Sequence, residues 1–451
     1  MSSIRCFKAY DVRGRVPDEL DEDIAYRIGR GYAAFVAPAR VAVGRDIRLS
    51  SPALASALAE GLVDAGVEVL DIGVVGTEMV YFATFAQGLD GGLMVTASHN
   101  PPDYNGIKMV RSEARPLSAD TGLMDIRALA EQNRFSAGRR GGIRQVDVGP
   151  EYVAHLSSYI EPEALKPLKI VVNAGNGGAG PIVDALEQAL PFTFVKLHHE
   201  PDGRFPNGVP NPMIEANRTV TSRLIQETGA DLGVAWDGDF DRCFLFDERG
   251  QFIEGYYIVG LLAGSFLAKE PGQAIVHDPR LIWNTLDVVA AAGGRAVQSK
   301  SGHAFMKQVM RESDAVYGGE MSAHHYFRRF SYADSGMIPW LLITEIISRS
   351  GRPLSELVAD RMALYPASGE LNRKVDDADK VMRQIESAYA SGALTTEHAD
   401  GLSMTFANWR FNLRASNTEP LLRLNVESRQ DVDLMREKTA ELLERIGGEP
   451  G

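Results

Sequence analysis

Cysteine is nearly absent from this chain, because only Cys6 and Cys243 occur among its 451 residues. Two cysteines so placed suggest neither a disulfide framework nor a zinc site. Cys243 stands in an apolar, strand-like run, which is typical of a buried free thiol. The sequence therefore predicts a protein of a reducing compartment.

Basic clusters and long apolar runs are missing as well. The formal charge is -13, and no block of Lys and Arg is present to neutralise a run of phosphates. Nucleic acid and anionic membranes are therefore disfavoured as partners. The longest apolar stretch, about residues 256–268, is shorter than the roughly 20 residues of a membrane span, and the first residues lack the apolar segment of a signal peptide. We expect a cytoplasmic protein without nucleic-acid or membrane partners.

The chain does contain enough apolar residues for several domains. It is 45% hydrophobic and 24% charged, the composition of an ordinary globular protein. Helix-like and strand-like segments alternate in three successive blocks, each typical of an α/β unit. A separate C-terminal part follows them, in which strands are interleaved with two helices. The fold class is therefore α/β with a C-terminal α+β domain. We place the domain boundaries at 1–145, 146–250, 251–362 and 363–451.

The same patterns predict individual elements. Helices are expected at residues 52–65, 181–190, 256–268, 282–292, 303–311 and 430–446. Strands are expected at residues 67–71, 92–96, 168–173, 192–197, 232–236, 274–277, 295–298 and 315–317. Open α/β sheets carry their chemistry just beyond the carboxyl ends of strands, so the loops that follow these strands are the first candidates for a functional site.

Three carboxylates follow the strand predicted at 232–236. Asp237, Asp239 and Asp241 alternate along the chain, and an extended loop can point such residues to one side. Oxygen-only ligands favour Mg²⁺, Mn²⁺ or Ca²⁺ over zinc. The spacing also resembles a calcium-binding helix-loop-helix, but Arg242 stands where that loop needs glycine, and strands flank it. We predict a site for one hard divalent cation.

A candidate hydroxyl follows the strand predicted at 92–96. Ser98 lies in the segment Thr-Ala-Ser-His-Asn-Pro-Pro, residues 96–102, and its hydroxyl is suited to carrying a phosphoryl group. The segment is not the Gly-x-Ser-x-Gly elbow of hydrolases, and adjacent side chains such as Ser98 and His99 are not expected to form a serine–base pair. Together with the three carboxylates, this hydroxyl indicates metal-assisted phosphoryl transfer.

Two further loops carry polar groups suited to a phosphorylated sugar. Residues 414–420, Arg-Ala-Ser-Asn-Thr-Glu-Pro, offer a guanidinium and hydroxyls that match a dianionic phosphate. Residues 318–325, Gly-Gly-Glu-Met-Ser-Ala-His-His, offer groups that accept from and donate to sugar hydroxyls. Either segment is also compatible with an ordinary polar turn.

A glycine pattern supports a competing interpretation. Gly175, Gly177 and Gly180 follow a predicted strand and open a predicted helix, and Glu200 stands about 20 residues beyond, as in a dinucleotide-binding fingerprint. A tight turn with close helix packing explains the same pattern.

Six ordered motifs, which span nearly the whole chain, resemble those of the α-D-phosphohexomutase family. They occupy residues 7–14, 96–102, 105–108, 237–242, 319–324 and 414–420. Residues 277–281 and 324–327 are most similar to the bacterial phosphomannomutase branch. The resemblance implies three similar mixed α/β domains and a C-terminal α+β domain, like the TATA-binding protein, around a central active-site cleft. It also implies that the glycine-rich turn binds no dinucleotide.

The resemblance implies a reversible interconversion of mannose 6-phosphate and mannose 1-phosphate. The reaction would pass through a phosphoserine enzyme and a hexose 1,6-bisphosphate, with one Mg²⁺ per chain as cofactor and the bisphosphate as activator. The alternatives are a bifunctional phosphomannomutase/phosphoglucomutase, a phosphoglucomutase or phosphoglucosamine mutase and, from a different class, a metal-dependent sugar phosphatase. The partners expected are small hexose phosphates, with a role in GDP-mannose and polysaccharide supply, and the chain is expected to be a monomer or weak dimer.

Site residues also follow from the resemblance. The metal ligands would be Ser98, Asp237, Asp239 and Asp241. The catalytic residues would be Ser98, Lys108, Arg13, His99, Arg242 and His303. We favour Lys108 as general base, with a pKa lowered by an electropositive site. The sugar would be held by Glu320, Ser322, His324 and Arg280, and the phosphate by Arg414, Ser416, Asn417 and Thr418.

Overall fold

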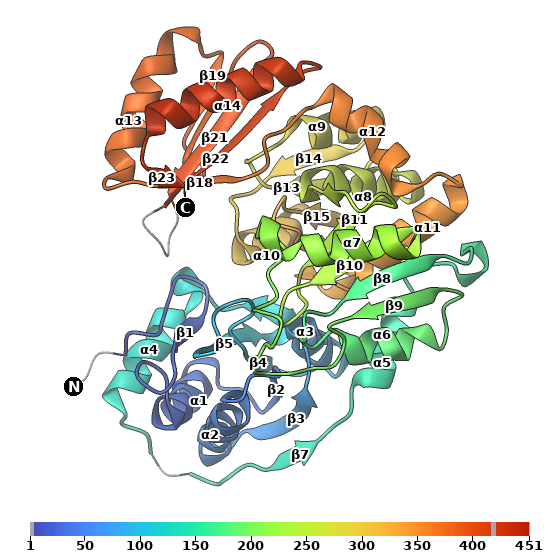
Figure 1. The fold of residues 1–451 in the computed structure, drawn as a ribbon. Coiled ribbons are helices and arrows are strands. Elements are labelled where there is room, and N and C mark those ends of the chain that lie inside the picture. Colours follow the sequence, from blue (N-terminus) through green and yellow to red (C-terminus); the bar gives the residue numbers. More distant parts are fainter. Residues whose placement is uncertain (1–3, 137, 416–420, 451) are drawn as a thin grey trace. The chain divides into compact units, whose positions relative to one another are not determined.

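The computed structural model describes residues 4–136, 138–415 and 421–450 (Figure 1). The chain divides into two compact units. Unit 1 comprises Met1–Phe252 and Tyr326–Gly351, and unit 2 comprises Ile253–His325 and Arg352–Gly451. In the part of the chain that the structure describes, no helix has the length and apolarity to cross a membrane.

The first sheet of unit 1 is a mixed seven-stranded sheet. Its strands, in sheet order, are β1 (Val12–Arg15), β5 (Tyr104–Arg111), β4 (Gly91–Val95), β2 (Arg40–Arg45), β3 (Glu68–Val74) and β7 (Ile143–Gln145), with β6 (Arg115–Pro116) paired to β5. The helices of this part are α1 (Glu22–Val36), α2 (Ser51–Asp64), α3 (Thr77–Ala86) and α4 (Leu123–Gln132). Strands β3, β2 and β4 run parallel, and β5 lies antiparallel to β4.

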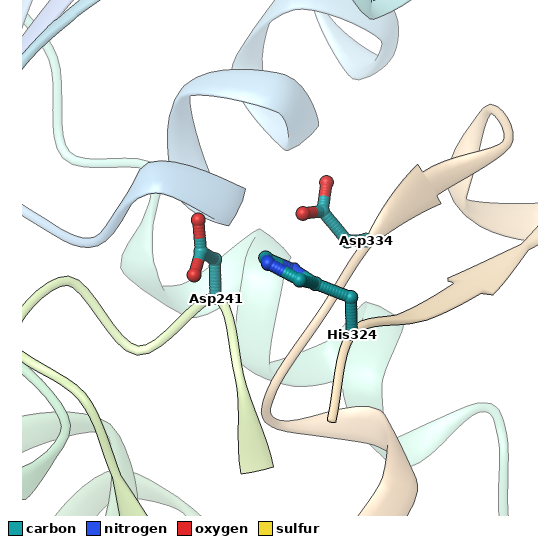
Figure 2. A group of neighbouring side chains, drawn as sticks. All are labelled: Asp241, His324 and Asp334. Carbon is teal, nitrogen blue, oxygen red and sulfur yellow. The ribbon is translucent and has the colours of Figure 1, made fainter. Parts of the chain in front are cut away.

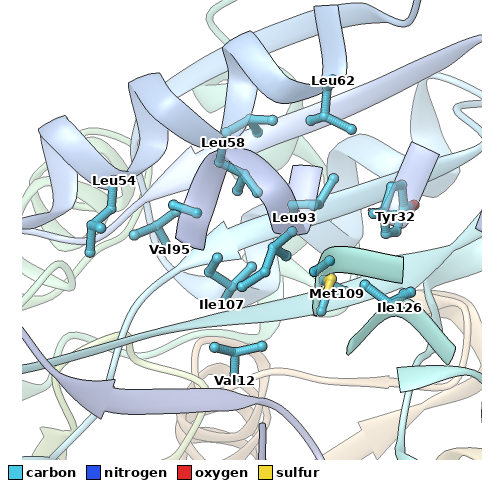
Figure 3. Close-up of a cluster of buried hydrophobic side chains, with 14 of the residues drawn as sticks. Val12, Tyr32, Leu54, Leu58, Leu62, Leu93, Val95, Ile107, Met109 and Ile126 are labelled. Carbon is cyan, nitrogen blue, oxygen red and sulfur yellow. The ribbon is translucent and has the colours of Figure 1, made fainter. Parts of the chain in front are cut away.

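The core of this part lies between the sheet and its helices (Figure 3). Leu54, Leu58 and Leu62 recur every four residues on α2, so they share one helix face and pack in a buried cluster with Leu93 of β4 and Ile107 of β5. All five side chains are almost completely buried. This packing holds β4 and β5 in place, and both strands lead to candidate site residues.

The second sheet of unit 1 is built around a buried central strand. Its order is β11 (Cys243–Phe246), β10 (Leu232–Trp236), β8 (Lys169–Asn173) and β9 (Thr193–Leu197), with the short β12 (Phe252–Ile253) at the edge beside β11. The helices here are α5 (Gly149–Ser157), α6 (Gly180–Glu187) and α7 (Thr219–Thr228). The last part of unit 1 contains β17 (Ala333–Asp334), paired antiparallel with the end of β16 (His325–Phe327), and α11 (Ile338–Ser350).

Unit 2 contains a parallel arrangement followed by an antiparallel sheet. Strands β14 (Arg295–Gln298), β13 (Ala274–His277) and β15 (Tyr317–Gly319) are parallel neighbours, and the helices are α8 (Gly255–Lys269), α9 (Trp283–Ala291), α10 (His303–Ser313) and α12 (Leu354–Leu364). The C-terminal sheet has the order β19 (Thr395–Glu397), β20 (Leu402–Thr405), β21 (Trp409–Ala415), β22 (Leu421–Ser428), β18 (Leu371–Lys374) and β23 (Glu449–Pro450). Helices α13 (Ala378–Tyr389) and α14 (Val432–Ile446) accompany it, and it has a hydrophobic core of its own. The prediction of mixed α/β domains followed by an α+β domain is confirmed.

Candidate active site

Ser98 lies three residues beyond the end of β4, in the connection to β5. We call this connection together with the first residue of β5, residues 96–104, the serine loop. Its side chain is almost buried, with 4% exposed, and its N–H donates to Thr96 Oγ1 at 2.9 Å. The backbone of Ser98 has φ +48°, a left-handed conformation that costs a residue other than glycine about 1–3 kcal/mol. Contacts around the loop must therefore compensate for this cost.

The acidic loop, residues 237–242, joins β10 to β11 and brings three buried carboxylates together. One oxygen from each of Asp237, Asp239 and Asp241 lies within 4.8 Å of the others. Ser98 Oγ donates to Asp237 Oδ2 at 2.8 Å. The candidate hydroxyl and the candidate cation site are therefore direct neighbours.

The acidic loop fits a hard divalent cation. Asp237 Oδ1 and Asp239 Oδ1 are buried and accept no hydrogen bond from the described residues, which is costly for oxygens that neither a donor nor a cation satisfies. Asp334 of β17 stands near Asp241 and adds further negative charge (Figure 2). Carboxylate oxygens are the ligands that Mg²⁺, Mn²⁺ and Ca²⁺ prefer.

Lys108 and Arg242 supply positive charge to these carboxylates. Lys108 Nζ donates to Asp239 Oδ2 at 2.7 Å and to Asp241 Oδ2 at 2.6 Å, and Arg242 Nη2 donates to Asp237 Oδ2 at 2.7 Å. Although burial opposes the change, the two carboxylates raise the pKa of Lys108 above its ordinary value. The expectation of an electropositive site that lowers this pKa is wrong, because acidic groups are the nearest neighbours of the ammonium.

His99 contacts the hydroxyl of the residue before it. Ser98 Oγ lies 3.0 Å from His99 Nδ1, and Arg242 Nη2 donates to the same nitrogen. Since a guanidinium can only donate, Nδ1 carries no proton. Partial burial and the Arg242 charge lower the pKa of His99 to about 4. The left-handed turn at Ser98 brings the two adjacent side chains together, but the Ser98 hydroxyl donates to Asp237, so the expectation that they form no serine–base pair stays a prediction.

Arg13 reaches the serine loop from β1. Its Nη1 donates to the Ala97 carbonyl at 3.1 Å and to Asn100 Oδ1, and its Nη2 pairs with Asp11. Strand β1 pairs with β5, with Arg13 opposite Gly106, so the sheet register places Arg13 close to the loop. Unit 1 thus gathers Ser98, Lys108, Arg13, His99, Arg242, Asp237, Asp239 and Asp241.

The remaining predicted residues lie in unit 2. Arg280 is buried, and its Nη2 donates to Glu320 Oε1 at 3.4 Å and to Ser322 Oγ at 3.2 Å. His303 is the first residue of α10, and the N–H of the preceding Gly302 donates to Glu320 Oε1 at 2.9 Å. Glu320 and Ser322 belong to the predicted sugar-binding loop. The Glu320 N–H closes the backbone of this loop by donating to the carbonyl of His324 at 2.9 Å.

Glu370, which the sequence analysis missed, connects this loop with the predicted phosphate-binding segment. Its Oε2 accepts from Arg414 Nη2 at 3.1 Å and from Arg280 Nη1 at 3.4 Å, and its Oε1 lies 3.6 Å from Arg423 Nη1. Despite burial, these guanidinium groups hold the pKa of Glu370 below its ordinary value. Arg414 and Arg280 therefore share one carboxylate. The predicted ligands Ser416, Asn417 and Thr418 lie outside the described residues.

The glycine-rich turn before α6 packs against the acidic loop. The Gly178 N–H donates to the Gly238 carbonyl at 3.1 Å, and a Cβ on Gly177 would lie 2.8 Å from that oxygen. Glycine is needed here because two backbones meet. The packing explanation of the glycine pattern therefore has a direct structural basis.

Thr77, at the start of α3, is a further contact of the acidic loop that the sequence analysis missed. Its N–H donates to the Asp239 carbonyl at 3.1 Å, and its Oγ1 donates to Asp239 Oδ2. Lys108 Nζ lies 3.3 Å from the same hydroxyl. No local sequence pattern around Thr77 points to a partner 162 residues away.

Comparisons with known proteins identify the family of the chain. The models described as phosphoglucomutase/phosphomannomutase α/β/α domains I, II and III match residues 5–137, 150–250 and 254–365, and the model of the C-terminal domain matches residues 370–444. The phosphomannomutase of Escherichia coli strain K12 is 58% identical over 451 residues, covering 98% of this chain and 99% of that protein.

Two other proteins are similar over their full lengths. The phosphohexose mutases protein of Xanthomonas campestris pv. campestris strain B100 is 57% identical over 447 residues, covering 99% of this chain and 100% of that protein. The crystal structure of a phosphoglucomutase/phosphomannomutase family protein from Burkholderia thailandensis has a TM-score of 0.88 and 34% identity, covering 100% of this chain and 99% of that chain. Four matching domain models and full-length relatives show that the chain belongs to the phosphoglucomutase/phosphomannomutase family.

Proposed function

We propose that this protein is a phosphomannomutase that interconverts mannose 6-phosphate and mannose 1-phosphate. The observation that carries the proposal is the 2.8 Å hydrogen bond from Ser98 Oγ to Asp237, which joins a candidate phosphoryl carrier to a three-carboxylate loop. The full-length relative named phosphomannomutase, at 58% identity, supports mannose phosphate as the substrate.

In the proposed cycle, Ser98 carries a phosphoryl group and passes it to the free hydroxyl of a hexose monophosphate. The Ser98 Oγ–P bond breaks as the sugar oxygen–P bond forms, which gives a hexose 1,6-bisphosphate. The proton that the sugar hydroxyl loses balances the proton that Ser98 Oγ gains. The sugar turns over, and its other phosphate returns to Ser98, so the net change is isomerisation. Asp237 accepts the hydrogen bond of the Ser98 hydroxyl, and His99 Nδ1 lies 3.0 Å from the same oxygen, so both side chains orient it.

Phosphoryl transfer mainly requires that the charge on the phosphoryl oxygens be stabilised. Asp237, Asp239 and Asp241, with an oxygen on Ser98, would hold Mg²⁺, which when bound supplies this neutralisation. Arg242 keeps a positive charge beside Asp237. Lys108 is protonated in the arrangement described, so we assign it donation of a proton or hydrogen bond to an oxygen of the reacting group.

The substrate-binding residues are proposed to lie in unit 2. Arg414, with residues 416–418, would hold the phosphate that is not reacting, since a guanidinium bonds such a group in a bidentate manner. Glu320, Ser322 and His324 would hold the sugar. The buried ion pair between Arg280 and Asp278, at 2.7 Å, keeps the Arg280 side chain fixed beside the loop that contains Glu320 and Ser322. His303 and Arg13 complete the proposed catalytic set.

We also propose a hexose 1,6-bisphosphate as activator and a monomer or weak dimer in the cytoplasm, with no nucleic-acid or membrane partner. The two free, buried cysteines support a reducing compartment such as the cytoplasm. The net charge of -13 supports the absence of nucleic acid and anionic membranes as partners.

The proposal is tested by measuring kcat/KM for mannose 1-phosphate and glucose 1-phosphate side by side, with Mg²⁺ and a catalytic amount of hexose 1,6-bisphosphate. A large preference for mannose 1-phosphate supports the proposal. Release of inorganic phosphate without isomerisation would show a sugar phosphatase instead and overturn it.

A bifunctional phosphomannomutase/phosphoglucomutase is a second candidate. The specific observation in its favour is the full-length relative named phosphohexose mutases, at 57% identity. Mannose and glucose differ only at C2, so a site that accepts both needs no change in the phosphoryl-transfer groups. Comparable kcat/KM values for the two sugar phosphates would support this candidate over a dedicated phosphomannomutase.

A further inference from the structure

Arg48 is a buried side chain that makes four hydrogen bonds to the backbone of the serine loop. It lies just beyond β2, and 1% of the residue is exposed. Its Nη2 donates to the carbonyls of Ser98 at 2.9 Å and Asn100 at 2.6 Å. Its Nη1 donates to the carbonyls of Pro101 at 2.6 Å and Tyr104 at 3.0 Å. One guanidinium thus satisfies carbonyl oxygens along nearly the whole loop.

The guanidinium itself is fixed from its other sides. Arg48 Nε lies 3.3 Å from Asp46 Oδ2, and Asp46 Oδ1 accepts the Arg48 N–H at 3.0 Å and the hydroxyl of Ser51. The ring of Phe205 lies against the guanidinium, with its centroid 5.1 Å from Cζ. These contacts fix the orientation of the planar Arg48 guanidinium group, and its four hydrogen bonds then fix the positions of the loop carbonyls.

The Ser98 carbonyl is also fixed on the side of the acidic loop. A Cβ on Gly238 would lie 2.5 Å from this oxygen, so the backbones of the two loops touch. The same carbonyl accepts from Arg48 Nη2, and the Ser98 side chain donates to Asp237. The left-handed backbone of Ser98 is therefore held from both sides. A shift of the serine loop would change the distance between Ser98 Oγ and the carboxylates.

We propose that Arg48 is a positioning residue for phosphoryl transfer, because it fixes the serine loop so that Ser98 Oγ faces the acidic loop. The inference rests on the proposed function. Arg48 acts through the loop carbonyls and donates to no side chain of the acidic loop among its described hydrogen bonds. Lysine cannot replace it, since an ammonium has three donors on one nitrogen and cannot reach four carbonyls in one plane.

The test compares Arg48→Lys with the wild type in single-turnover transfer. Each enzyme is phosphorylated with glucose 1,6-bisphosphate, and the rate of phosphoryl transfer to mannose 1-phosphate is followed by rapid quench with Mg²⁺ present. The rate constant describes each folded molecule, whereas the amplitude counts folded molecules. We expect the rate constant to fall about 100-fold, as for a misplacement of about 1 Å, with KM for mannose 1-phosphate changed less than threefold.

Arg30→Lys is the matched control. Arg30 of α1 is also buried, donates to the Ser136 carbonyl at 2.9 Å and lies over the ring of Phe135. This variant should keep the wild-type rate constant. The proposal is overturned if Arg48→Lys transfers at the wild-type rate, or if its loss appears only in the amplitude. An equal drop in both variants' rate constants would also overturn it.

If Arg48→Lys does not fold, Asp46→Asn carries the test, since it keeps the four carbonyl contacts but weakens the support of the guanidinium. A severalfold smaller rate constant is expected, and a wild-type rate constant would refute the proposal.

Labelling of the wild-type enzyme distinguishes a failure of this inference from a failure of the proposed function. If glucose 1,6-bisphosphate does not label Ser98 in the wild type, the proposed function fails. If labelling occurs and Arg48→Lys behaves as the wild type, only this inference fails.

Discussion

The carboxylate of Glu78 accepts the backbone N–H of Gly336 at 2.5 Å. Glu78 is fully buried in the first turn of α3, and its other oxygen accepts the hydroxyls of Ser335, at 3.0 Å, and of Tyr152. The Gly336 carbonyl in turn accepts from Trp236 Nε1 at 2.9 Å, next to the acidic loop. One ionisable group therefore joins three segments of unit 1 through neutral partners.

The first prediction concerns pH and Glu78. Burial raises the pKa of Glu78 to about 8, whereas the unfolded chain has the ordinary value near 4.3. Between these values the folded protein binds a proton that the unfolded chain has released. Stability is therefore lost as pH rises from about 5 to about 8, by up to about 1.4 kcal/mol per pH unit. Glu78→Gln, which cannot titrate, should reduce this slope in urea unfolding from pH 5 to 9.

The control for this experiment is Glu163→Gln, because Glu163 is exposed. It should keep the wild-type slope. An unchanged slope in Glu78→Gln would mean that Glu78 does not contribute to the pH dependence of folding.

Ser98→Ala should reduce turnover by several orders of magnitude, because it removes the proposed phosphoryl carrier. Ser98 contributes one side-chain hydrogen bond to Asp237 and contacts His99, so the fold should remain intact. Isomerisation of mannose 1-phosphate, with the bisphosphate primer present, measures the effect, and circular dichroism checks folding. Near wild-type turnover of the purified variant would rule out the phosphoserine mechanism.

Asp239→Asn should weaken activation by Mg²⁺. The substitution removes a negative charge from a three-carboxylate set and a partner of Lys108. We expect the Mg²⁺ concentration for half-maximal activity to rise at least tenfold and excess EDTA to abolish activity in both proteins. Glu248→Gln, two residues beyond β11, is the control and should keep the wild-type Mg²⁺ dependence. The cation assignment fails if Asp239→Asn shows the wild-type dependence as well.

Gly238→Ala should separate the serine loop from the acidic loop. The new Cβ would lie 2.5 Å from the Ser98 carbonyl, so one of the two backbones must move. Since the site depends on the alignment of both loops, we expect kcat to fall about 100-fold. Gly138→Ala is the control, because a Cβ there meets no atom within 4 Å. Equal kcat values for the two variants would show that this contact does not set the geometry.

Regular elements with apolar runs were predictable from the sequence. The strand predicted at 232–236 coincides with β10, because five consecutive buried residues end at the acidic loop. The last helix begins at Val432 rather than 430, because Gln430 has φ +56° and the Asp431 side chain caps the helix by accepting the Leu434 N–H. The strand predicted at 315–317 lies at 317–319, where it continues through two glycines.

The site residues were predictable where a sequence motif itself supplies the chemical groups. Their contacts and pKa values were less predictable, because these depend on residues distant in the sequence. The serine and acidic loops are neighbours, as their chemistry required. The contacts of Arg48 join segments about 50 residues apart, so no local pattern indicates them. The pKa of Lys108 was predicted with the wrong sign, because the sequence does not show that its nearest neighbours are carboxylates.

The contact between Gly178 and Gly238 links two main chains without a side chain. Such a link does not depend on the rotamer of any side chain. The relative position of the glycine-rich turn and the acidic loop is therefore set by the path of the two backbones at Gly178 and Gly238.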